Sequence, residues 1–113
     1  MLHSVNLSDF MLHDPITIHP EDALSTAVTL ITDKKVSGLC VADTNDVLIG
    51  VLSEMDCLSA ALDHTSSDSI LRNATVSEYM FSKPITIQHE EDLYTAIKKI
   101  LEHRISGLCV VDQ

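Results

Sequence analysis

The first third of the chain changes from an alternating pattern to a helical one. Ile16-Thr17-Ile18 alternates apolar and polar side chains, which predicts a short strand. Pro20-Glu21-Asp22 follows, and a proline at the first helical position with acids in the first turn predicts a helix start there. One face of that predicted helix is apolar, with residues at helical spacing: Leu24, Ala27, Val28 and Ile31.

The next segment predicts a β-hairpin and a second helix. Two apolar runs, Leu39–Ala42 and Val47–Leu52, flank the turn-forming residues 43–46. Ser53 then opens a helix in which one face is apolar, with Met55, Leu58 and Leu62. The predicted order is strand, helix, strand, strand, helix, preceded by a short helical turn over residues 8–11.

This plan occurs twice. Ser37-Gly38-Leu39-Cys40-Val41 returns letter for letter at residues 106–110, an offset of 69 positions (from Ser37 to Ser106) that aligns the two copies without a gap. The second copy therefore predicts a strand at residues 85–87, an apolar helix face and a strand at residues 108–111. That helix face comprises Leu93, Ala96, Ile97 and Ile100.

We expect repeats at residues 1–62 and 75–113, joined by a polar linker at residues 63–74. The sequence holds no counterpart of residues 45–62 in the second copy, so that repeat is expected to stop after its second strand. Such a strand has an open hydrogen-bonding edge and an uncovered apolar face. Either further polypeptide or another chain is expected to cover them.

Charge and composition narrow the class of function. The 17 acids and 7 bases give a net charge of −10, which argues against nucleic acid and against an anionic membrane surface. An adenylate stays possible, because one local base can meet a phosphate. The three cysteines are odd in number and form no CxxC pair, and Cys40 and Cys109 occupy the same repeat position within apolar runs. They are interpreted as small buried hydrophobes in a protein of the reducing cytoplasm.

No targeting, membrane or catalytic motif is visible. The first residues lack a signal-peptide pattern, and no apolar run approaches the roughly 18 residues of a membrane span. Gly-rich phosphate loops, HExxH, GxSxG and EF-hand spacings are absent from the sequence. The six histidines are scattered, so neither an enzyme nor a metal site is predicted.

The element order and two runs, residues 35–43 (KVSGLCVAD) and 104–112 (RISGLCVVD), closely resemble the CBS domain, which occurs in tandem pairs called Bateman modules. Family members often have proline where Cys40 and Cys109 stand here, a change that is conservative in size. The resemblance implies an α/β (α+β) fold of two pseudo-twofold related β-α-β-β-α units, the second incomplete at its C-terminus.

The resemblance also implies a function. CBS pairs are regulatory modules without catalytic activity, and their cleft between repeats commonly holds AMP, ADP, ATP or S-adenosylmethionine as a regulatory ligand. No cofactor is required. Many members form homodimers, and many switch a partner protein. The alternative is a ligand-free module that dimerises and docks on a partner.

The family pattern Gly-h-x-Ser/Thr-x-x-Asp, where h is apolar, matches residues 50–56, so the resemblance assigns the ribose hydroxyls to Ser53 and Asp56. A carboxylate accepting two adjacent hydroxyls is sound chemistry for ribose, and a helix start offers backbone amides to phosphate. Ser-x-x-Asp at a helix start is equally a capping box that needs no ligand, and both roles can coexist.

Other ligand contacts are expected around the predicted second strand. The resemblance implies that the backbone around Thr17 passes close to the base, and that Val36, Ser37, Gly38 and Leu39 line the other side. Gly38 either lets the backbone approach a flat ring or only turns the chain from helix to strand. Arg104 is the preferred phosphate contact, since its fork matches phosphate geometry, although a solvated helix end explains it too. Ser106 holds the matching place in the second copy.

Overall fold

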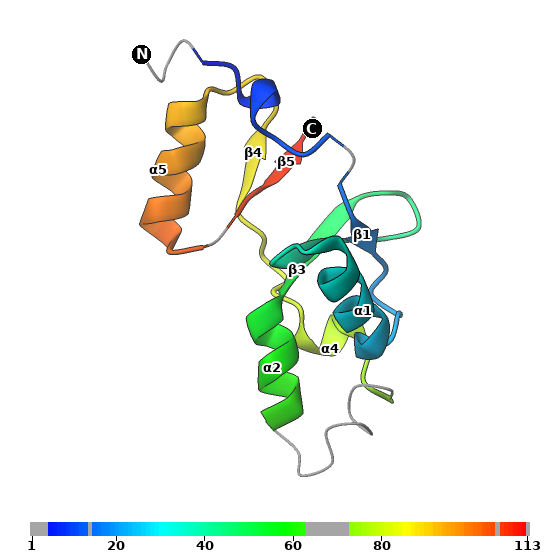
Figure 1. Cartoon of the computed structure of the whole chain (residues 1–113). Helices are drawn as coiled ribbons and strands as arrows, with labels where there is room; N and C mark the ends of the chain where they lie inside the picture. Colours follow the sequence, from blue (N-terminus) through cyan, green and yellow to red (C-terminus); the bar gives the residue numbers. More distant parts are fainter. Residues whose placement is uncertain (1–4, 14, 63–72, 106, 113) are drawn as a thin grey trace. The chain divides into compact units, whose positions relative to one another are not determined.

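The computed structural model describes residues 5–13, 15–62, 73–105 and 107–112, with side chains. The chain divides into two compact units, one formed by Pro15–Pro84 and the other by Met1–Asp14 together with Ile85–Gln113. Helices and strands follow one another in the predicted order (Figure 1), which confirms the mixed α+β fold class.

The larger unit, Pro15–Pro84, holds a three-stranded sheet in the order β1-β2-β3. β1 runs parallel to β2, and β2 pairs antiparallel with β3, which confirms the predicted hairpin. Its elements are β1 (Thr17–Ile18), α1 (Leu24–Lys34), β2 (Gly38–Ala42), β3 (Leu48–Ser53), α2 (Glu54–Leu62) and α4 (Val76–Tyr79).

The core of this unit lies between the sheet and its helices. Leu24, Val41, Leu52 and Val76 are fully buried there, and each comes from a different element. Burying one such side chain contributes about 1.5–3 kcal/mol relative to leaving it exposed. The predicted core face of α1 is largely confirmed, since Ala27 and Ile31 share this cluster and Val28 packs against it half-buried.

The predicted start of α1 at Pro20-Glu21-Asp22 is wrong, because the helix begins at Leu24. Residues 19–22 instead form a turn, in which the amide of Asp22 donates to the carbonyl of His19 at 3.1 Å. The Asp22 carboxylate accepts in return from the amide of His19 at 3.0 Å. An acid that bonds the local backbone in this way stabilises a turn in competition with a helix.

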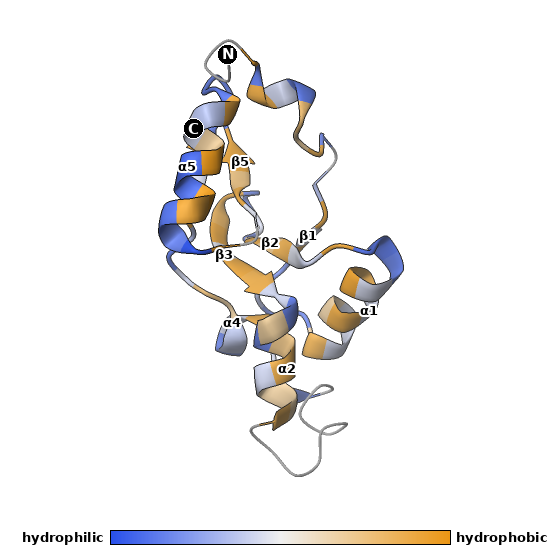
Figure 2. Cartoon of the chain, turned by 60° about the vertical axis from the view of Figure 1, so that its left-hand side comes forward, coloured by the Kyte–Doolittle hydropathy of each residue, from blue (hydrophilic) through white to orange (hydrophobic). Residues whose placement is uncertain are grey.

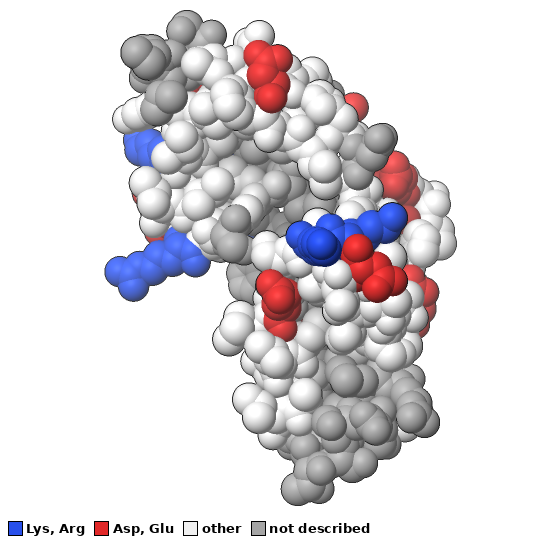
Figure 3. All heavy atoms as spheres, viewed as in Figure 1, with Lys and Arg blue, Asp and Glu red and all other residues white. Residues whose placement is uncertain are grey.

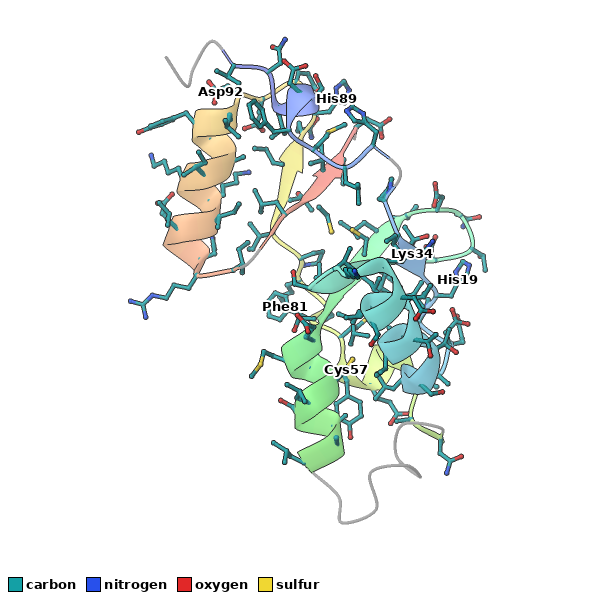
Figure 4. All side chains as sticks on the ribbon, viewed as in Figure 1. His19, Lys34, Cys57, Phe81, His89 and Asp92 are labelled. Carbon is teal, nitrogen blue, oxygen red and sulfur yellow. The ribbon has the colours of Figure 1, made fainter. Side chains whose placement is uncertain are left out.

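The predicted apolar face of α2 is exposed, and a different face of this helix is buried. Met55, Leu58 and Leu62 share one helical face as predicted, yet all three are exposed. Cys57 and Ala60 provide the buried face, and Figure 4 shows Cys57 on the side of α2 toward the rest of this unit. Small side chains let the helix approach its neighbours closely, which leaves its larger apolar residues facing outward.

The smaller unit contains η2 (Leu7–Asp9), β4 (Thr86–Gln88), α5 (Leu93–His103) and β5 (Cys109–Val111). Its two strands are parallel, and among the described residues β5 pairs with β4 alone. Leu7, Ile87 and Ala96 form its core. Asp92 caps α5 by accepting from the amide of Thr95 at 2.9 Å.

A short stretch lies at the start of each repeat, residues 5–12 and 74–81, and we call these two stretches the lead segments. The amide of Leu24 donates to the carbonyl of Ala74 at 3.0 Å. At the same repeat positions, the amide of Leu93 donates to the carbonyl of Val5 at 3.2 Å. Each lead segment therefore packs on the strands and helix of the other repeat. Residues 63–72 of the predicted linker lie outside the described residues, whereas Ala74 is buried.

Candidate ligand-binding site

The end of β3 and the start of α2 carry the residues predicted to bind ribose. Ser53 is the last residue of β3, and Asp56 lies in the first turn of α2. The Asp56 Oδ2 atom accepts from the Ser53 amide at 2.8 Å and from the Ser53 hydroxyl at 3.0 Å. The amide of Asp56 donates to the Ser53 hydroxyl at 3.2 Å. The capping-box interpretation is thus confirmed.

This cap leaves hydrogen-bonding capacity for a ligand. Both side chains are half-buried rather than sealed. The second oxygen of Asp56, Oδ1, accepts no hydrogen bond from any residue that the structure describes. The Ser53 hydroxyl has used its one donor and one of its two acceptor lone pairs. The site therefore offers acceptors, and its chemistry suits a partner with adjacent hydroxyl donors.

The start of β2 lies directly beside these residues. Gly38 is paired with Ser53 in the antiparallel ladder, and the amide of Glu54 donates to the carbonyl of Ser37 at 2.9 Å. Two amides of the first turn of α2, those of Glu54 and Asp56, thus have partners within the protein. Fewer helix-start amides are available to a phosphate than the sequence suggested.

Gly38 does not turn the chain from helix to strand. That turn is made at Lys35, the C-cap of α1, whose φ of 56° is left-handed, whereas Gly38 lies within β2. A Cβ at Gly38 would lie 3.0 Å from the carbonyl oxygen of Leu52. The glycine therefore lets β2 and β3 approach closely at the point where Gly38 pairs with Ser53.

Of the remaining predicted ligand contacts, most belong to the larger unit and one described residue belongs to the smaller unit. Thr17 is exposed on β1 and pairs with Cys40, while Val36 is half-buried before β2. Leu39 is buried in the core, so only its backbone could face a ligand. Arg104 is the exposed C-cap of α5 in the smaller unit, and Ser106 lies outside the described residues. The larger unit thus contains Thr17, Val36, Ser37, Gly38, Leu39, Ser53 and Asp56, of which Gly38 and Ser53 are direct partners in the sheet.

Sequence reasoning missed the second lead segment as a support for this site. Val51 and Phe81 exchange two backbone hydrogen bonds, of 3.0 and 2.8 Å, and Figure 4 shows Phe81 beside β3. A Cβ at Gly50 would lie 2.7 Å from the Met80 sulfur. Met80 repeats Met11, which indicated the duplication but gave no sign of this contact.

The electrostatics near the site do not favour a reactive group. Burial raises the pKa of the Cys57 thiol, and the nearby carboxylates of Asp56 and Glu54 raise it further, so formation of the reactive thiolate is disfavoured. Among the described residues, no group of three or more His, Cys, Asp or Glu side chains could hold a metal ion. On the face shown in Figure 3, lysines and arginines occur in small separate groups interspersed with acids.

Three comparisons with known proteins agree on the type of repeat. The CBS domain family matches residues 7–63 and 76–113. An inosine-5'-monophosphate dehydrogenase of Nitrosopumilus maritimus is 29% identical over 102 residues, which cover 90% of this chain and 19% of that protein. The chain spans between 19% and 34% of the length of the first curated relatives it matches.

Solved structures share the fold. The structure of CBSX2 in complex with AMP is 29% identical with a TM-score of 0.79, covering 96% of this chain and 83% of that one. The CBS domain pair of protein MJ0100, in complex with 5'-methylthioadenosine and S-adenosyl-L-methionine, is 24% identical with a TM-score of 0.82, and covers 96% and 82%. No helix within the described ranges is both long and apolar enough to cross a membrane.

Proposed function

The chain belongs to the CBS domain family, and from its two repeats we propose that it is a non-catalytic regulatory module that binds an adenosine-containing ligand. The ligand class is AMP, ADP, ATP or S-adenosylmethionine, and no cofactor is needed. The catalytic relatives carry CBS repeats as a small part of their length, so their activities are not assigned to this chain. The odd number of cysteines without a CxxC pair fits a location in the reducing cytoplasm.

The observation that carries this proposal is the pair of unused acceptors at the start of α2. Asp56 Oδ1 and one lone pair of the Ser53 hydroxyl are available beside the backbone of Ser37 and Gly38. A ribose carries two adjacent hydroxyl donors, and hydrogen bonds to a carboxylate are about twice as strong as neutral ones. The AMP complex of CBSX2, a relative with 29% identity, supports the adenosine class.

Thermal melting with each of the four ligands tests the proposal. A ligand that binds only the folded state adds about 2.7 kcal/mol at a hundredfold excess over Kd, which moves the melting temperature by several degrees. We expect a shift with at least one ligand, and its loss in Asp56→Ala. The absence of any shift in the wild type at millimolar ligand would refute the adenosine proposal.

A matched variant separates ligand binding from helix capping. Thr75 and Glu78 form a second capping box in the same unit, at the start of α4. Glu78→Ala removes that cap without touching Ser53 or Asp56, so its melting temperature should fall while the ligand-induced shift persists. Loss of the shift in both variants would mean that Asp56 acts through stability alone.

The second candidate function is a homodimeric module that docks on a partner without a ligand. The exposed apolar faces of α2 and α5 favour it, because such faces mark interaction surfaces. Both candidate functions, ligand binding and partner docking, include a homodimer, so dimer formation alone does not distinguish them. A partner that binds the protein identically with and without each adenylate would favour the second.

A further inference from the structure

The two faces of the sheet in the larger unit differ in burial. The core face carries buried side chains, among them Leu39, Val41 and Leu52. Successive residues of a strand point to opposite faces, and residues paired across strands share a face. The opposite face, which we call the outer face, therefore carries the half-buried or exposed residues that alternate with the buried ones: Thr17, Gly38, Cys40, Val51 and Ser53. One of the two proposed ribose contacts, Ser53, lies on it.

Phe81 adds an aromatic ring to the outer face. It lies opposite Val51 in an antiparallel bridge with backbone hydrogen bonds of 3.0 and 2.8 Å, and Figure 4 shows it beside β3. Residues directly opposite each other share a face. The preceding residue, Met80, packs against the core cluster, and a Cβ at Gly50 would meet its sulfur. Met80 thus belongs to the core side and Phe81 to the outer side.

The ring of Phe81 lies within reach of the ribose contacts. Val51 and Ser53 are two residues apart on β3, which separates Phe81 from Ser53 by about 7 Å along the sheet. Figure 2 shows β3 as mostly hydrophobic up to its end, where the more polar start of α2 follows. Phe81 is 57% exposed, although its backbone is held by both bonds to Val51. A positioned, accessible ring and a hydroxyl acceptor therefore lie on one face.

We propose that Phe81 packs against the base of the adenosine ligand whose ribose binds Ser53 and Asp56. This contact rests on the proposed function and adds a specificity-determining residue to that site. With the ribose at Ser53, the base extends across Val51 toward Phe81. Hydroxyl acceptors alone bind a nucleotide and a simple sugar phosphate equally, since both carry adjacent hydroxyls. A neighbouring aromatic face favours the nucleotide, because base–aromatic stacking is worth about 5- to 150-fold in affinity.

Position distinguishes Phe81 from other exposed apolar residues, which by themselves are ordinary on a protein surface. Phe10 is exposed to a similar degree, 65%, but belongs to the smaller unit. At the repeat offset, Phe81 matches Leu12, so the aromatic ring occurs in one of the two copies. Phe81→Leu therefore installs the residue that the chain already has at the matching position, and it keeps apolar surface while removing the flat ring.

Calorimetry with two probes tests the base contact. One probe is the adenylate that shifts the melting temperature of the wild type, and the other is ribose 5-phosphate, which has the sugar and a phosphate but no base. We expect Phe81→Ala to bind the adenylate about 5- to 150-fold more weakly and ribose 5-phosphate as the wild type does. Phe81→Leu should lie between them. Phe10→Ala, which loses the same side chain elsewhere, should bind both probes normally.

A fluorescent variant tests the position directly. The chain contains no tryptophan, so Phe81→Trp introduces a single indole at the proposed contact. Tryptophan keeps an aromatic face for the base, so this variant should bind the adenylate at least as tightly as Phe81→Leu does. A stacked purine quenches indole fluorescence, so the adenylate should lower the emission and ribose 5-phosphate should not. The emission of Phe10→Trp should respond to neither probe.

Three results would overturn the base contact: unchanged adenylate affinity in Phe81→Ala, an equal loss for both probes, or no quenching in Phe81→Trp at saturating adenylate. The Asp56→Ala variant separates this outcome from failure of the proposed function. Adenylate binding that is lost in Asp56→Ala and kept in Phe81→Ala refutes the base contact alone. A wild type that binds none of the four adenosine ligands refutes both the base contact and the proposed function.

Discussion

The Asp56 carboxylate accepts two hydrogen bonds from Ser53, one from its amide at 2.8 Å and one from its hydroxyl at 3.0 Å. Both use the same oxygen, Oδ2, so one half of the carboxylate holds the start of α2 and the other half is available to a ligand. A structural role and a binding role therefore coexist in one side chain, and variants can measure them separately.

We expect Asp56→Ala to lower the free energy of unfolding by about 1 kcal/mol, the usual cost of losing a helix cap. Asp56→Asn keeps an acceptor oxygen for the Ser53 amide and should lose only part of that stability. Urea unfolding of the ligand-free protein measures both. Equal stability of Asp56→Ala and the wild type would contradict the capping role.

Gly50→Ala should destabilise the protein by about 1–3 kcal/mol, because overpacking forces neighbours to move. The added Cβ would meet the Met80 sulfur at 2.7 Å and the Phe81 carbonyl oxygen at 3.0 Å. Gly107→Ala is the matched control, since nothing lies within 4 Å of its added Cβ. Its unfolding free energy should change by less than about 0.5 kcal/mol. Similar losses in both variants would show that the lead segment is not the obstacle.

Glycine at the two helix C-caps should stabilise the protein. Lys35 and Arg104 have φ values of 56° and 54°, which glycine adopts without the penalty paid by other residues. Lys35→Gly and Arg104→Gly are each expected to raise the free energy of unfolding by about 0.5–1 kcal/mol. If Arg104 meets phosphate as the sequence predicts, its variant should also bind AMP more weakly. Calorimetry gives the affinity, and an unchanged AMP affinity would argue against that role.

Leu7→Ala should lower the stability of the smaller unit and leave that of the larger unit unchanged. Leu7 is buried there with Ile87 and Ala96, and losing such a side chain costs about 2–5 kcal/mol. Hydrogen exchange should become faster in β4 and α5 and stay unchanged in β2 and β3. Val76→Ala, at a fully buried position of the larger unit, should give the reverse pattern. Uniform acceleration in either variant would show that the two units unfold together.

Cys57 should make stability fall at alkaline pH. Burial raises its pKa above the ordinary 9.0, so the folded protein holds the thiol proton more tightly than the unfolded chain does. That contribution is present below pH 9.0 and is lost as the pH rises through the folded pKa. The unfolding free energy of Cys57→Ala should therefore decline less steeply above pH 9.0 than that of the wild type. Parallel declines would contradict the raised pKa.

The fold was predictable where local patterns decide it. The hairpin follows from two apolar runs around a turn, and the duplication shows most of the predicted elements twice in the sequence. The structure confirms their order. The capping geometry of Ser53 and Asp56 was readable because a capping box needs only residues three apart. Gly38 was ambiguous for the opposite reason, because its role depends on Leu52, which lies on a different strand.

Predictions failed where distant contacts decide. The helix start at Pro20 looked sound locally, but Pro20 and Asp22 offer their carbonyls to the amides of Ser77 and Val76, more than fifty residues away in sequence. The helical spacing in α2 identified its apolar face correctly and could not tell which face is buried. Small residues, Cys57 and Ala60, determined that.

The exchange of lead segments sets a limit on how this architecture can be divided. A half-length chain ending before residue 63 would keep α1 and its sheet but lose the residues that hydrogen-bond to Leu24 and Asp22. Its own first residues would also lack α5, with which they form a hydrogen bond in the full chain. Such a chain reaches the same arrangement only by trading its first residues with a second molecule. The duplication, in these terms, places two mutually dependent halves on one polypeptide, where neither half has to find the other by diffusion.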